Sequence, residues 1–154
     1  MAVYRIRLAK DKGELVKRLV ESDEDNAPFE TYADVVMFAA SLGYQRHQAI
    51  PLDDVIAKEP APIAWDVFRS RGYDRTIRLL AIATTEEVSV LSLSSPEAIA
   101  QQIQILEEYA NGGLQILQEE LRGIIDITHH LPLMLHKQRH PQESPPEFDL
   151  SQFL

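Results

Sequence analysis

The sequence predicts a mainly α-helical protein, a helical bundle that begins with one short β-strand. Three observations predict this class. Apolar residues recur every three or four positions over most of the 154 residues, which is the helical period. Residues typical of helix starts and stops flank these stretches. Near the N-terminus the period changes to two, which is typical of a strand with one apolar face.

The expected strand is the segment VYRIRLAKD at residues 3–11. Arg5 and Arg7 fall on one side of it, and Ile6 and Leu8 fall on the other. A helix is expected directly afterwards, over 11–22, because its leucines and valines are three and four positions apart. The chain is therefore expected to begin with a strand followed by a helix.

The stretch FETYADVVMFAASLGY at 29–44 predicts a helix that is apolar on nearly every side. Thr31 is a good N-cap with Asp34 three positions on, and Gly43 suits the left-handed position after the last turn. A helix that is apolar all round is buried all round. Either other helices of the same chain cover it, or it is shared with a second subunit in a homodimer.

Two further helices are expected in the middle of the chain, over 63–70 and 75–87. Pro62 suits the first turn of the former, and Asp74 suits the cap of the latter. The stretch VSVLSLSS at 88–95 alternates, so it is either a short strand or a loop. Upstream, the aspartates at 53 and 54 are expected to start a short helical turn.

From Ser95 and Pro96, a strong helix start, the pattern predicts one long helix or two collinear ones reaching to about residue 131. Gly112 and Gly113 interrupt this pattern, and each lowers the stability of a helix by about 1 kcal/mol. They mark either a turn between two helices or a point of close packing, and we favour the break. Pro132 is expected to end or kink the last helix.

A proline-rich, polar segment divides the chain into a helical domain at 1–136 and a linker with an apolar tail at 137–154. The tail is expected to dock, either on its own domain or a sister subunit, or on a foreign partner. Its partner-binding candidates are Phe148, Leu150, Phe153 and Leu154.

Charge is distributed unevenly along the chain, whose net charge is −9. Residues 1–20 carry six basic and two acidic groups, whereas residues 79–126 carry eight acidic groups and one basic group. This excludes wrapping of nucleic acid over the whole surface, but one end could meet an anion. The chain has no cysteine and no long apolar run, so we expect a cytoplasmic protein without membrane contact.

Basic residues at the N-terminus are the candidates for nucleic-acid binding: Arg5, Arg7, Lys10 and Lys12. A strand with two basic residues followed by two helices is the order of a ribbon–helix–helix DNA-binding protein. The alternative is an edge strand whose charges prevent aggregation. A second basic set, which structural salt bridges can equally explain, is Arg69, Arg71, Arg75 and Arg78.

Catalytic and metal-binding signals are weak, so we expect no enzyme and no cofactor. Neighbouring glutamates fit a solvated helix face better than acid–base catalysis; they are Glu107, Glu108, Glu119 and Glu120. Histidines near the end of the last helix fit a solvated helix end better than a metal site; they are His129, His130, His136 and His140. Trp65 fits a core position beside Phe68 better than a stacking platform.

Four segments resemble a small family associated with DNA phosphorothioation (dnd) gene clusters, bacterial systems that place sulfur in the DNA backbone. They are RIRLAKDKGELVKRLV, FETYADVVMFAASLGY, EPAPI with VFRSRGYD, and EEYANGGLQILQEEL. The resemblance covers about residues 4–125 and leaves out the tail. It implies an accessory protein of DNA modification or of the coupled restriction, with DNA or other proteins of that system as partners. It brings no catalytic residues.

Overall fold

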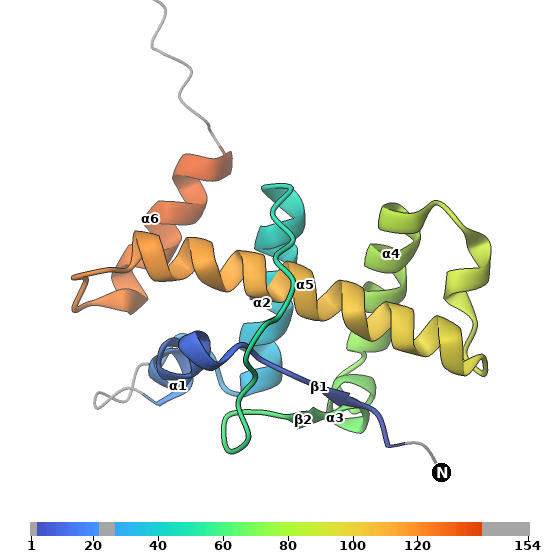
Figure 1. Cartoon of the computed structure of the whole chain (residues 1–154). Helices are drawn as coiled ribbons and strands as arrows, with labels where there is room; N and C mark the ends of the chain where they lie inside the picture. Colours follow the sequence, from blue (N-terminus) through green and yellow to red (C-terminus); the bar gives the residue numbers. More distant parts are fainter. Residues whose placement is uncertain (1–2, 22–26, 140–154) are drawn as a thin grey trace, which may run out of the picture.

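A computed structural model describes residues 3–21 and 27–139 of the chain, and helices dominate them (Figure 1). The long helix α5 runs through the molecule, and α2 crosses its middle. The elements are β1 (Arg5–Ile6), η1 (Lys10–Lys12), α1 (Gly13–Val20), α2 (Tyr32–Gln45), β2 (Ile63–Ala64), α3 (Trp65–Ser70), α4 (Tyr73–Thr85), η2 (Val88–Leu91), α5 (Pro96–Glu120) and α6 (Ile127–Arg139). The expected mainly α-helical class is confirmed.

Helix α2 begins as the sequence predicts, since the Thr31 hydroxyl accepts a hydrogen bond from the Asp34 amide at 3.2 Å. The predicted stop at Gly43 is wrong, because the helix continues to Gln45. Gly43 is needed instead for packing: a Cβ there would lie 2.1 Å from the carbonyl oxygen of Tyr109 on α5. The left-handed backbone conformation after the helix belongs to His47, with φ of 54°.

The predicted break at Gly112–Gly113 is also wrong, because α5 is continuous from Pro96 to Glu120. A Cβ on Gly112 would lie 1.7 Å from the Gln48 carbonyl oxygen, and one on Gly113 would lie 1.7 Å from that of Ala39. The two glycines therefore let α2 and the loop after it approach the backbone of α5. The packing gained at this contact outweighs the helix propensity lost.

The chain itself covers the apolar helix α2, as the first alternative predicted. Val35, Val36 and Ala39 are fully buried, and they belong to one core cluster with Leu106 and Leu114 of α5. A second subunit is therefore not needed to explain why this helix is apolar. The homodimer stays a prediction, and the apolar character of α2 no longer supports it.

The N-terminal strand pairs within the chain. Arg5 of β1 lies opposite Ala64 of β2 in an antiparallel register, and Ile6 lies opposite Ile63. Ile6 is fully buried, as the alternation predicted. The partner strand was not predicted, and it stands where Pro62 was expected to open a helix.

Several local predictions fail in the loops. The turn of helix expected at Asp53 or Asp54 is absent there, and the backbone amide of Lys10 donates to the Asp54 carbonyl oxygen instead. The stretch 88–95 is neither strand nor plain loop, because it begins with the 3-10 helix η2. Ser95, the last residue of this stretch, caps α5 as expected, since its hydroxyl accepts a hydrogen bond from the Ala98 amide at 3.3 Å.

The remaining elements complete the core. Trp65 and Phe68 of α3 are buried, which confirms their predicted core position. Helix α4 follows Gly72, which has φ of 78°, and Asp74 lies in its first turn rather than at its cap. Pro132 lies inside α6. In the described part of the chain, no helix is long and apolar enough to cross a membrane.

Candidate functional site

Polar side chains form a stripe along α5 on the face that meets the N-terminal segment and the loop at 50–54. They are three or four positions apart, which places them on one side of a helix. Most of these side chains form hydrogen bonds with residues of those two segments. This polar stripe consists of Gln104, Glu107, Asn111, Gln115 and Gln118.

Glu107 holds Arg7 through three hydrogen bonds. The Arg7 backbone amide and Nε donate to Oε2 at 2.7 and 3.0 Å, and Nη2 donates to Oε1 at 3.1 Å. The Glu107 side chain is only 2% exposed, whereas that of Arg7 is 55% exposed. The hydrogen bond and the charge of Glu107 raise the pKa of Arg7. The prediction that Glu107 lies on a solvated face is wrong, because its side chain is buried. Arg7 compensates its charge and donates hydrogen bonds to both of its carboxylate oxygens.

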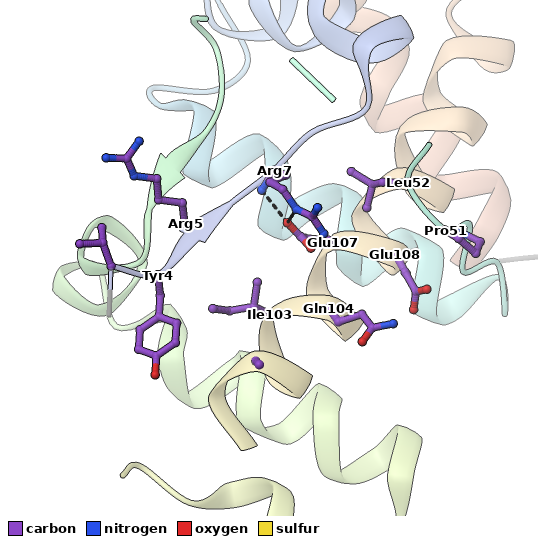
Figure 2. A pocket seen from close by; sticks show the side chains of 11 residues that line it. Tyr4, Arg5, Arg7, Pro51, Leu52, Ile103, Gln104, Glu107 and Glu108 are labelled. Atoms are coloured by element: carbon purple, nitrogen blue, oxygen red, sulfur yellow. Dashed lines mark hydrogen bonds and ion pairs between the residues drawn. The ribbon is translucent and has the colours of Figure 1, made fainter. Parts of the chain in front are cut away.

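The Arg7 hollow, a surface cavity of about 450 Å³, lies between β1 and the stripe (Figure 2). Figure 2 shows Arg7 directed toward Glu107, whereas the Arg5 side chain points away from it. Leu52 and Ile103 give the hollow apolar walls. A guanidinium that is fixed in place and still half exposed can bind an anion with little loss of side-chain entropy.

The structure divides the four N-terminal candidates for nucleic-acid binding. Arg5 and Lys10 are exposed, and Arg7 is exposed in part. Lys12 is buried: its Nζ donates to Asp11 Oδ2 at 2.7 Å and to Gln115 Oε1 at 2.8 Å. Arg5, Arg7 and Lys10 can therefore reach an external anion without a change of fold, whereas Lys12 is directed into the protein.

Salt bridges account for three members of the second basic set, as their structural interpretation predicted. The pairs are Arg69 with Asp66 at 3.6 Å, Arg78 with Asp74 at 3.4 Å, and Arg71 with Asp34 at 2.9 Å. Arg75 is exposed on α4.

Asp34 is the centre of the Arg71 contact and also accepts a hydrogen bond from the Tyr73 hydroxyl. Burial alone would raise the pKa of this carboxyl. The hydrogen bonds from Tyr73 and Thr31, together with Arg71, outweigh that effect and leave the pKa lowered. These contacts join the start of α2 to the turn before α4, so we assign them to the fold.

The other candidate groups do not converge in the described residues. Glu119 and Glu120 are exposed at the end of α5, and Glu108 is half-buried. Within 3–21 and 27–139, no group of three histidine or acidic side chains is placed to hold a metal ion. The three histidines of α6 are His129, His130 and His136. His140 and the four apolar residues of the tail lie outside the described residues.

Sequence reasoning missed the polar stripe. Its signal is the spacing of Glu107, Asn111 and Gln115, which repeats every four positions on a helix otherwise rich in leucine and isoleucine. Polar residues that recur in this way on a helix face indicate a polar partner surface. The partner Arg7 lies 100 positions away, and nothing in the local sequence points to it.

The described residues thus define a small, mainly α-helical protein with a charged hollow where its N-terminal strand meets a long central helix. The chain matches, over residues 5–153, the family described as DNA sulphur modification system-associated protein 4, and it belongs to that family. The match includes the tail, so the expectation that the family likeness covers about residues 4–125 and leaves out the tail is wrong. No curated protein and no solved structure gave a significant match.

Proposed function

We propose that this chain is a non-enzymatic binding protein of a DNA sulphur modification system and that its N-terminal strand contacts the DNA backbone. Membership of the family supports the link to such a system. The observation that carries the DNA contact is the placement of Arg5, Arg7 and Lys10, whose side chains remain exposed on one short segment while Lys12 is buried.

Phosphate oxygens are the expected ligands of these three residues. Phosphate contacts position a protein on DNA without reading its sequence, and arginine is well suited to them. Arg7 would contribute as a preformed contact, because Glu107 fixes its guanidinium. The acidic residues elsewhere would repel DNA, so binding would be confined to this end of the molecule.

The test is fluorescence anisotropy of a labelled duplex, at low and at physiological salt. The variant Arg5→Glu/Lys10→Glu should bind at least about tenfold more weakly than the wild type. The matched control is Lys58→Glu/Arg75→Glu, which changes the net charge equally at exposed positions outside the hollow. A duplex carrying phosphorothioate tests whether sulfur is recognised.

Two results would overturn DNA contact at this site. One is the absence of binding at low salt, and the other is an equal loss in the control variant. Arg7 is left unchanged because its removal would leave the buried carboxylate of Glu107 without its partner.

The second candidate is an adaptor that binds another protein of the system without touching DNA. Large apolar side chains are exposed beside acidic ones around the end of α4 and the start of α5, which favours this alternative. The apolar residues are Leu79, Val88 and Leu93, at 67%, 76% and 72% exposed, and the acidic residues are Glu86, Glu87 and Glu97. The tail residues Phe148, Leu150, Phe153 and Leu154 would add a docking segment.

Deletion of residues 140–154 tests the adaptor, because it removes the tail and leaves α6 complete to Arg139. The adaptor hypothesis predicts a folded protein that no longer captures partner proteins of the system in a pull-down. A deletion variant that folds and still captures them would exclude the tail as the docking segment.

A further inference from the structure

The outer edge of β1, which is the edge turned away from β2, carries backbone groups that no strand pairs. The Tyr4 carbonyl oxygen accepts from the Trp65 amide at 3.0 Å, so the backbone of Tyr4 faces the β2 side. Because backbone groups alternate between the two edges of an antiparallel strand, Arg5 and Arg7 direct theirs to the outer edge. The Arg7 amide there donates to Glu107. The Arg5 amide and carbonyl oxygen have no hydrogen-bond partner at this edge in the described part of the chain.

The Arg7 hollow lies along this outer edge. Side chains of β1 and of α5 line it from two sides (Figure 2). An unpaired strand edge is a template for another extended chain, which would lie about 4.8 Å from β1. The hollow, of about 450 Å³, leaves room for such a chain beside Arg5. The pairing would stop at Arg7, because Glu107 occupies the place of the next strand there.

The charges along this edge favour an acidic chain. Arg5 is exposed and has no salt-bridge partner among the described residues, and Arg7 is 55% exposed. Both lie on one face of β1, and Lys10 is exposed further along the same segment. Two acidic residues also line the hollow. Glu107 is buried against Arg7, and Figure 2 shows Glu108 on the opposite side of the hollow from Arg5, so an acidic side chain beside Arg5 meets a cation.

The tail of this chain has a sequence that matches the edge. Residues 147–151, EFDLS, alternate strictly between acidic or polar and apolar side chains, which is the period of a strand with one apolar face. Glu147 and Asp149 belong to one face, and Phe148 and Leu150 belong to the other. β1 alternates in the same way between basic and apolar residues, with the opposite sign of charge.

We infer that residues 147–151 of a second copy of this chain add to the outer edge of β1 as an antiparallel strand. Asp149 lies opposite Arg5, and their backbone amides and carbonyl oxygens form two hydrogen bonds. Glu147 then lies opposite Arg7 on the same face, because directly opposed residues share a face. This inference does not rest on DNA contact, and its test contains no DNA.

The position of the tail favours a second copy over the same chain as the source. Residues 140–146 join α6 to the segment and span at most about 25 Å when fully extended. In Figure 1 the end of α6 and β1 lie on opposite sides of α5, so a tail that returned to its own β1 would have to pass around that helix. The tail of a second copy needs no such path. Reciprocal exchange of tails gives a closed dimer with two-fold symmetry.

The test is disulfide trapping with full-length chains, which contain no native cysteine. In the inferred register Val3, 71% exposed, lies opposite Ser151, at a Cα separation of about 5.5 Å that a disulfide can bridge. Val3→Cys chains mixed with Ser151→Cys chains and oxidised should form a linked dimer with one chain of each kind, identified by mass spectrometry. Gln152→Cys in place of Ser151→Cys directs the thiol to the other face and should give at least about tenfold less mixed dimer.

A charge reversal tests the contribution of the arginine. Arg5→Glu in the Val3→Cys chain should lower the yield of mixed dimer about fivefold, whereas Lys58→Glu, at an exposed position outside the hollow, should leave it unchanged. Absence of the mixed dimer, or equal yields with Ser151→Cys and Gln152→Cys, would overturn the inference. A disulfide-bonded monomer as the main product of Val3→Cys/Ser151→Cys would also overturn it, because the tail would then pair within its own chain. The comparison of the two tail positions keeps Arg5, so it decides the matter even if Arg5→Glu does not fold.

Discussion

Helix α5 is used in opposite ways on two of its faces. At its crossing with α2, glycine allows backbone to touch backbone, and the contact is apolar and closed. Along the polar stripe, charged and amide side chains join α5 to the N-terminal segment and leave the Arg7 hollow open to solvent. We therefore expect substitutions at the crossing to lower the free energy of unfolding most. The stripe instead fixes polar side chains beside a surface that is open to solvent.

The largest effect is expected at the crossing, from Gly113→Ala. The added Cβ would lie 1.7 Å from the Ala39 carbonyl oxygen, and backbone cannot move aside cheaply. We expect a loss of more than about 3 kcal/mol in the free energy of unfolding, measured by urea denaturation. Gly72→Ala is the control: its φ is positive but nothing lies within 4 Å, so about 1 kcal/mol is expected. Equal losses would contradict close packing as the role of Gly113.

A smaller effect is expected at the stripe, from Arg7→Met. This change leaves the buried carboxylate of Glu107 without its cation. We expect a loss of about 2 kcal/mol in the free energy of unfolding, less than for a fully buried pair because Arg7 is half exposed to water. Arg5→Met, on the same strand but with no salt-bridge partner among the described residues, should change stability by less than about 0.5 kcal/mol. Identical stability of the two variants would mean that Glu107 does not depend on Arg7.

The Asp34 contacts predict a pH dependence of stability. The folded-state pKa of Asp34 is below its ordinary value of 3.8. Its contribution is therefore present above that value and is lost as pH falls toward the lowered pKa. Asp34→Asn should be less stable than the wild type at pH 7, and the gap should narrow below about pH 4. Asp66→Asn, at a side chain 89% exposed, should show no such gap.

The smallest effect is expected at a helix cap. Thr31→Ala removes the acceptor for the Asp34 amide and should cost about 1 kcal/mol in thermal or urea unfolding. Thr31→Ser keeps the hydroxyl and should stay close to the wild type. If both variants lose the same amount, the methyl group of Thr31 contributes rather than the cap.

The sequence was sufficient for features that depend on neighbouring residues. The apolar period predicted α2 and the course of α5, although α5 ends at Glu120 rather than near residue 131. The caps at Thr31 and Ser95 were predicted correctly. Glycine was misjudged at Gly43 and Gly113, because a residue without a side chain suits both a helix end and a close contact. Only the position of the helix that packs against the glycine decides between a helix end and a close contact.

The site was less predictable, because its contacts join distant segments. Arg5 and Lys10 were identified as exposed basic residues, and they are exposed. The burial of Glu107 and Lys12 was missed, since each depends on a partner about a hundred positions away. Strand β2 was missed because two residues are too few to show a period.

The most direct measurement is the salt dependence of duplex binding by the wild type and by Arg5→Gln. Three phosphate contacts, from Arg5, Arg7 and Lys10, predict a slope of about −2.7 for the logarithm of the binding constant against that of salt concentration. Loss of one contact should make the slope about 0.9 less steep. An unchanged slope in Arg5→Gln, or binding that does not respond to salt, would contradict DNA contact through the N-terminal strand.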